Sequence, residues 1–130
     1  TAYSRGFHLK QDFYNGLNYA FQLERRAVKF AKAGEREEAI ADRVLARRVR
    51  EEVLNYVAPE VDAQAELPVG TRYWLLASMW EACAGLGRGD EAAHWERRAR
   101  EIGPTQWMLE STEVQIANIA KVKAELAQLL

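Results

Sequence analysis

Apolar residues recur at intervals of three and four along most of the chain, which is the spacing of one face of an α-helix. Leu17, Phe21 and Val28 illustrate this spacing in the first such stretch. The pattern predicts the last turns of one helix over residues 1–10 and five further helices, over residues 13–33, 35–57, 71–86, 89–102 and 106–129. No stretch alternates apolar and polar residues in the way a β-strand requires. The predicted fold class is therefore all-α.

Residues that end or begin helices lie between these ranges. Gly34 suits the left-handed backbone conformation at a helix end, and Gly87 and Gly103 mark two further breaks. Capping side chains are expected at three positions, which are Asp12, Thr71 and Thr105. Pro59 and Pro68 bracket the one long loop, which is predicted over residues 58–70.

One spacing of small residues occurs twice. A Gly is followed by an Ala five residues later and by a second Ala seven residues further on. The two copies are Gly34, Ala39 and Ala46, and Gly87, Ala92 and Ala99, with Pro104 closing the second copy. The second copy resembles the latter half of a tetratricopeptide repeat, a helix pair of about 34 residues. Trp80 and Glu96 depart from the family pattern, which has a small residue and an aromatic residue at these positions.

This resemblance implies antiparallel helix pairs in a short right-handed solenoid. The implied parts are the tail of a preceding repeat (1–12), a first helix pair (13–57), a loop (58–70), a second pair (71–104) and a capping helix (105–130). The chain opens with Thr1 rather than Met, so we expect it to be a piece of a longer protein.

Two stretches resemble a narrower group. Asp12–Ala20 and Tyr73–Ser78 are similar to segments of tetratricopeptide regions described as TRAF-binding in mitogen-activated protein kinase kinase kinases. Bacterial proteins of unknown role carry the same combination. The resemblance implies a scaffolding or regulatory segment of a larger signalling protein, and not that this chain binds TRAF proteins.

In tetratricopeptide proteins the first helix of each pair lines the concave face. The resemblance therefore implies a ligand groove lined by Phe21, Glu24, Arg25, Val28, Lys32, Trp74, Ser78 and Glu81. Phe21 and Trp74 are the candidate anchors, because rigid aromatic side chains supply contact area at low entropic cost. The alternative interpretation places both aromatic residues in the core.

Composition narrows the function further. The 18 Lys and Arg residues and the 19 Asp and Glu residues give a net charge of −1, whereas nucleic-acid binders generally carry a basic excess. Glu51 and Glu52 follow Arg47, Arg48 and Arg50 within the same two helical turns, which predicts a solvated face with i,i+4 ion pairs. The single Cys83 excludes an internal disulfide and is expected to be a buried thiol.

We expect no catalytic set, no metal site, no cofactor, no nucleic-acid partner and no membrane partner, and a cytoplasmic location. The sequence predicts a non-catalytic interaction scaffold that binds a peptide or a neighbouring domain. The alternative is a structural module that self-associates, for example as a homodimer, without a peptide ligand.

Overall fold

The computed structural model describes residues 9–63 and 66–130, with side chains from residue 15 onward. Its described residues form five helices and no strand, which confirms the all-α prediction. The helices are α1 (Leu9–Lys32), α2 (Arg36–Ala63), α3 (Val69–Gly85), α4 (Gly89–Glu101) and α5 (Gln106–Leu129). None of these helices is long and apolar enough to cross a lipid bilayer.

The predicted loop over residues 58–70 is too long. Helix α2 continues to Ala63 and contains Pro59, and α3 begins at Val69. A proline inside a helix removes one backbone hydrogen bond, which is tolerated where packing holds the following turn. Val57 and Val61 lie one turn apart in the core, and their burial offsets the lost hydrogen bond.

The expected caps are also corrected. Residues 9–12 belong to α1, so Asp12 lies inside the helix, and Thr71 lies inside α3. Thr105 does precede α5, but its side chain makes no capping hydrogen bond. Residues 1–8 of the proposed earlier repeat lie outside the described residues.

The two copies of the Gly-Ala-Ala spacing form the same turn. Gly34 and Gly87 have φ values of 81° and 74°, as the left-handed conformation requires. In each copy the residue after the glycine donates its backbone N–H to a carbonyl five residues earlier, from Glu35 to Phe30 and from Arg88 to Cys83, both at 2.9 Å. The alanines that follow, Ala39, Ala46, Ala92 and Ala99, are all buried. The repeated spacing therefore marks two equivalent helix hairpins.

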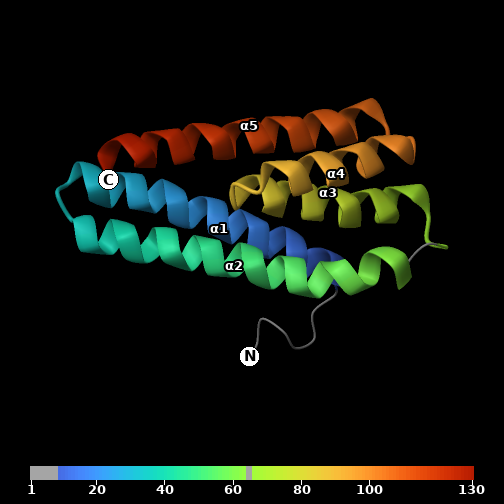
Figure 1. Cartoon of the computed structure of the whole chain (residues 1–130), viewed down its shortest axis with the longest axis horizontal. Coiled ribbons are helices and arrows are strands. Elements are labelled where there is room, and N and C mark those ends of the chain that lie inside the picture. The colour runs from blue at the N-terminus through green and yellow to red at the C-terminus, as the bar shows by residue number, and fades with distance from the viewer. Residues whose placement is uncertain (1–8, 64–65) are drawn as a thin grey trace.

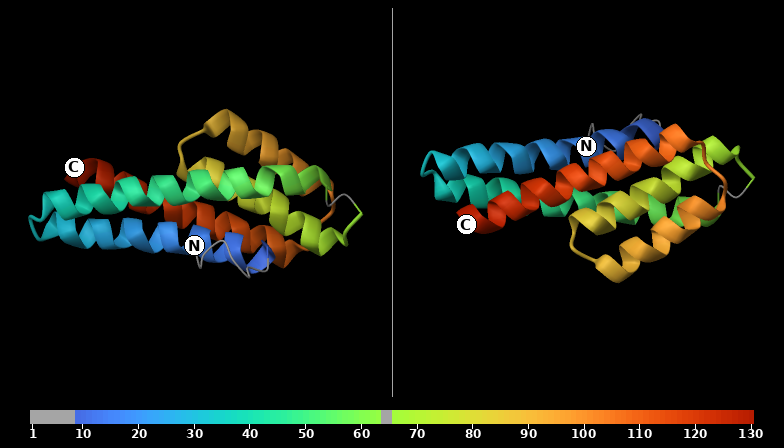
Figure 2. Two further views of the ribbon diagram at one scale, coloured as in Figure 1. Left: turned by 90° about the horizontal axis from the view of Figure 1, so that it is seen from below. Right: turned by 90° about the horizontal axis from the view of Figure 1, so that it is seen from above.

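Figures 1 and 2 show how these hairpins are arranged. The pairs α1–α2 and α3–α4 are antiparallel hairpins, and α2 packs against α3. Helix α5 runs in the same direction as α1 and α3 and lies along both of them (Figure 2). This position differs from the end of the helix stack, where we expected it.

A buried tyrosine fixes α5 against α3. The Tyr73 hydroxyl lies 2.7 Å from Thr112 Oγ1 and donates a 3.2 Å hydrogen bond to the Met108 carbonyl oxygen. Tyr73 is completely buried, so its hydroxyl depends on these partners. The contact sets the register between the first turns of the two helices.

A buried ion pair joins α1 to α2. Arg50 Nη1 and Nη2 donate two hydrogen bonds of 2.7 Å to the two carboxylate oxygens of Glu24. Both residues are only 1% exposed, so Arg50 does not belong to the solvated face expected of the arginine-rich stretch. Lys123 Nζ on α5 lies 3.6 Å from Glu24 Oε2. The pair therefore sits where α1, α2 and α5 meet.

Gly85 at the end of α3 makes room for the same arginine. A Cβ atom at position 85 would lie 2.6 Å from both Cδ and Cζ of Arg50. The guanidinium group cannot move aside without breaking its paired hydrogen bonds to Glu24. Residue 85 must therefore lack a side chain.

We predict that Gly85→Ala lowers the free energy of unfolding by about 1–3 kcal/mol, although alanine has the higher helix propensity. Gly89→Ala is the matched control, because nothing lies within 4 Å of a Cβ atom there. Urea denaturation of both variants measures the difference. Equal stabilities of the two variants would contradict the close packing of Arg50 on Gly85.

Candidate functional site

Most of the residues expected to line a groove do face one surface, and α5 lies on that surface. Val28 packs in a core cluster with Val122 and Leu126 of α5. Lys32 Nζ lies 3.3 Å from Glu125 Oε2 of α5. The face of α1 that was predicted to bind a ligand thus binds the chain's own last helix.

The remaining α1 candidates lie at the margin or inside. Glu24 is buried in its ion pair with Arg50. Phe21 is partly buried at the edge of the α1–α5 cluster, and the exposed Arg25 places its guanidinium carbon 5.9 Å from the centre of the Phe21 ring. Phe21 thus packs partly into the core, and Arg25 lies over its ring.

The α3 candidates lie where α5 begins. The rings of Trp74 and Trp107 have centroids 6.1 Å apart and planes inclined at 53°. Ser78 donates a 2.7 Å hydrogen bond to the carbonyl oxygen of Trp74 in its own helix, so its hydroxyl is already engaged. Trp74 is partly buried and packs against the main core cluster.

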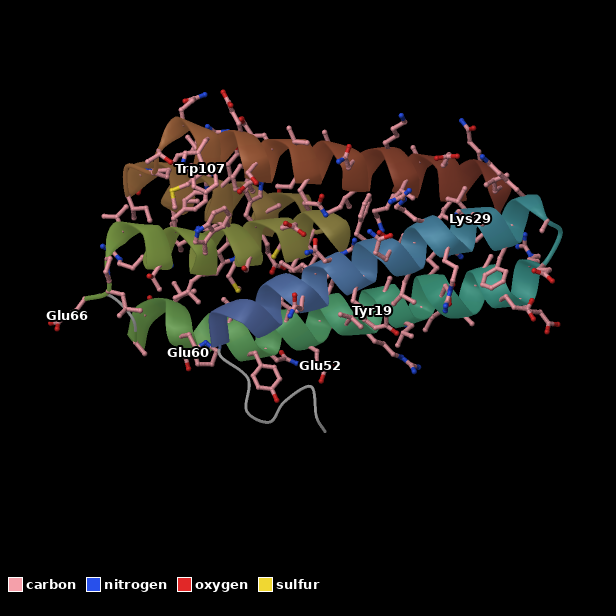
Figure 3. The ribbon with its side chains drawn as sticks, turned by 180° about the vertical axis from the view of Figure 1, so that it is seen from behind. Tyr19, Lys29, Glu52, Glu60, Glu66 and Trp107 are labelled. Atoms are coloured by element: carbon pink, nitrogen blue, oxygen red, sulfur yellow. The ribbon has the colours of Figure 1, made fainter. Side chains whose placement is uncertain are left out.

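A pocket of about 430 Å³ opens between α1, α3 and α5. Figure 3 shows α1 and α5 close together near Lys29 and well apart near Trp107, with α3 between them. The pocket lies at the open end and is lined by Leu17, Asn18, Trp74, Glu81, Trp107, Glu110, Ser111, Thr112, Val114 and Gln115. Of the eight predicted groove residues, Trp74 and Glu81 line it.

The α5 side of the pocket was missed by the sequence analysis. Trp107 is 64% exposed and Val114 is 60% exposed. They lie seven residues apart, on the same side of α5, while Met108, Thr112 and Ile119 form its buried side. The sequence does contain a signal for this surface, because Trp107 and Val114 are apolar residues outside the buried face of α5. Their role becomes clear only from the position of α5 beside Trp74.

Glu81 is the most perturbed carboxyl group of the pocket. Burial raises its pKa to about 7, although the positive charge of Arg50 and the nearby amide of Gln115 lower it. The residue as a whole is partly exposed and is one of those that line the pocket. The Gln115 amide is close enough to lower the pKa of Glu81, but its buried Nε2 atom makes no hydrogen bond. The charged form of Glu81 is therefore poorly compensated.

Cys83 has no such access to the pocket. The thiol is fully buried, and burial, with a smaller effect of Glu91, raises its pKa to about 11. The expectation of a buried thiol is confirmed. A thiol with so high a pKa is a poor nucleophile at neutral pH.

Comparisons of this chain with protein-family models, with curated proteins and with solved structures found no match. The resemblance to tetratricopeptide repeats therefore stays a prediction, and the site is interpreted from its own geometry.

We predict that Glu81→Gln stabilises the protein at pH 8 by up to about 3 kcal/mol, because one pKa unit corresponds to about 1.4 kcal/mol. The folded state holds this proton more tightly than the unfolded state, whose pKa is near 4.5. The stability linked to Glu81 is thus fully present below about pH 4.5 and is lost as the pH rises through about 7.

Urea denaturation of the wild type and the variant between pH 4 and 8 measures this effect. Glu113→Gln is the control, since Glu113 is an exposed carboxylate on the same helix as Gln115, and its solvent-exposed ion pair with Arg100 contributes little to stability. A Glu81→Gln variant that is less stable than the wild type at pH 8 would show that the carboxylate is well compensated.

Proposed function

We propose that this chain is a non-catalytic protein-interaction module, which binds a partner segment at the open end of the face shared by α1, α3 and α5. One observation carries the proposal: a pocket lined by two tryptophans and by both apolar and polar side chains remains where α5 diverges from α1. A module of this kind suits a cytoplasmic scaffold within a larger regulatory protein. The tetratricopeptide resemblance supports the same class of function.

Helix α5 itself illustrates how this face recognises a helix. Val122 and Leu126 pack on Val28, and the ion pairs Lys32–Glu125 and Glu24–Lys123 flank this apolar contact. Apolar anchors with charged groups at the margin are the usual way in which a groove binds an amphipathic helix. A partner segment could bind in the same way in the pocket between α1, α3 and the first turns of α5, where α5 no longer covers α1.

The pocket supplies anchors rather than reactive groups. Trp107 and Val114 expose apolar surface beside Trp74, and large rigid aromatic side chains dominate binding energies at interfaces. Polar groups of Asn18, Ser111 and Gln115 line the same pocket and suit hydrogen bonding to a peptide backbone. This combination is typical of a binding site with a specific orientation.

The direct test is selection of binding peptides from a display library against the immobilised full chain. The selected peptide is then titrated into ¹⁵N-labelled protein. We expect shifted resonances to cluster on Leu17, Trp74, Trp107 and Val114. A library that yields no saturable binder, or shifts confined to the outer face of α2, would contradict the proposal.

Trp107→Ala is predicted to weaken binding of the selected peptide by about tenfold or more, because an interface hot spot contributes about 2 kcal/mol. The free energy of unfolding should change little, since the side chain is mostly exposed. Leu45→Ala removes a partly exposed apolar side chain from α2 and is the matched control. Equal losses of affinity in both variants would place the binding surface elsewhere.

The exposed pair Trp107 and Val114 also supports the structural alternative, in which a second copy of the chain covers this surface. Light scattering at several protein concentrations separates the two functions. A dimer that Trp107→Ala dissociates would favour self-association, and a monomer at all concentrations would favour a separate partner.

A further inference from the structure

We infer that the pocket between α1, α3 and α5 binds an organic ammonium group, such as the side chain of a lysine residue in the partner. The inference rests on the proposed function for the identity of the partner, but the site itself is defined by the chemistry of the pocket. Nothing in the comparisons assigns such a site.

Two indole rings form the apolar wall. Trp74 and Trp107 meet at an angle of 53° with centroids 6.1 Å apart, so their faces make a corner rather than a flat stack. A cation is attracted to the face of an aromatic ring, and indole is the most favourable ring. Among the described residues, four other aromatic rings already have a guanidinium carbon within 6 Å, at Phe21, Phe30, Trp80 and Trp95. No guanidinium group of the described residues lies over Trp74 or Trp107, so this corner is open to an external cation.

Among the described residues that line the pocket, the charged ones have one sign. They are Glu81 and Glu110, and none of these described lining residues is basic. Arg50 is the nearest positive charge acting on Glu81, but both of its Nη atoms are bound to Glu24. An anionic ligand would be repelled, whereas a cation would compensate Glu81 and Glu110 together.

The hydrogen-bonding groups fit an ammonium ion. Such an ion has three donors and no acceptor, and the pocket offers carboxylate oxygens and the side-chain carbonyl oxygens of Asn18 and Gln115. The buried Gln115 Nε2 makes no hydrogen bond, although the Gln115 amide is close enough to Glu81 to lower the pKa of that carboxyl group. A volume of about 430 Å³ lies within the range of about 300–1,000 Å³ typical of ligand pockets.

A metal ion fits less well than an organic cation. Among the described residues, no three His, Cys, Asp or Glu side chains come together as metal ligands. The two indole faces would also contribute nothing to a hydrated divalent ion, which prefers oxygen ligands. The mixture of aromatic faces and carboxylates selects a cation with an apolar stem.

Binding should depend on pH through Glu81, whose pKa is about 7, while an alkylammonium ion stays charged. The groups around this carboxyl are Arg50 on α2, Gln115 and Glu110 on α5, and the Glu24–Lys123 pair beyond Arg50. We expect the affinity to fall by up to about tenfold from pH 8 to pH 6, as the proton competes with the ligand.

The test is an NMR titration of the ¹⁵N-labelled full chain at pH 8. The probes are Nα-acetyl-lysine methylamide, its Nε-trimethyl form and the neutral Nα-acetyl-norleucine methylamide. We expect the indole N–H resonances of Trp74 and Trp107 to shift saturably with the two cations and not with norleucine. Trp80 and Trp95 lie outside the pocket lining and serve as internal references.

Glu81→Gln should weaken binding of the cations by about tenfold and abolish the pH dependence, whereas Glu113→Gln should leave both unchanged. Tighter binding of either the lysine or the trimethyl-lysine probe identifies the form of the side chain. Equal shifts with norleucine, or an unchanged affinity in Glu81→Gln, would overturn the inference.

These results also separate the inference from the proposed function. Selected peptides that bind at Trp107 without any basic residue would refute the cation site and leave the interaction module standing. Saturable binding of the cations, with no peptide selected, would support the cation site and refute the peptide-binding role.

Discussion

The buried ion pair between Glu24 and Arg50 is the interaction on which the arrangement of the helices depends. Removing both charges from water is costly, and the paired 2.7 Å hydrogen bonds offset that cost only in one geometry. The geometry fixes α1 against α2, requires a glycine at position 85 of α3, and brings Lys123 of α5 to the same carboxylate. Four helices are thus positioned around one guanidinium group, although an apolar core covers most of the remaining interface.

The pairing of Arg50 with Glu24 also explains why the pKa of Glu81 is raised. Because both Nη atoms of Arg50 bind Glu24 and its buried Nε has no hydrogen-bond partner, Arg50 acts on Glu81 through its charge alone. Burial therefore prevails in raising the pKa of the Glu81 carboxyl group. A buried carboxylate without a close positive partner lowers the stability of the folded state. Such destabilising groups are common at binding sites, where a ligand can supply the missing interaction. Glu81 lines the same pocket as Trp107, the exposed tryptophan of α5. The carboxyl group with the raised pKa and the proposed binding surface therefore lie at the same end of the molecule, where α5 begins.

The sequence was sufficient to predict the helices and hairpins, because Gly34 and Gly87 fix equivalent turns through local backbone geometry. Most of the residues that it placed on one face of α1 and α3 do lie together, on the face along which α5 packs. The sequence could not predict that α5 lies on this face, since an apolar stripe does not specify which neighbour it packs against. The burial of Arg50 was missed for a similar reason: its neighbours along the chain suggest a solvated helix face, and its partner Glu24 lies 26 residues away. Pro59 was interpreted as a helix end because local rules omit the packing of Val57 and Val61.

The most direct test of the account is a double-mutant cycle on the free energy of unfolding with Glu24→Gln, Arg50→Met and the combined variant. Glu24→Gln should cost about 3–5 kcal/mol, because it leaves the buried guanidinium charge without its partner. The combined variant should be destabilised by much less than the two single changes together, since it removes both charges. Additive losses would mean that the two side chains do not depend on each other, and would contradict the central place given to this ion pair.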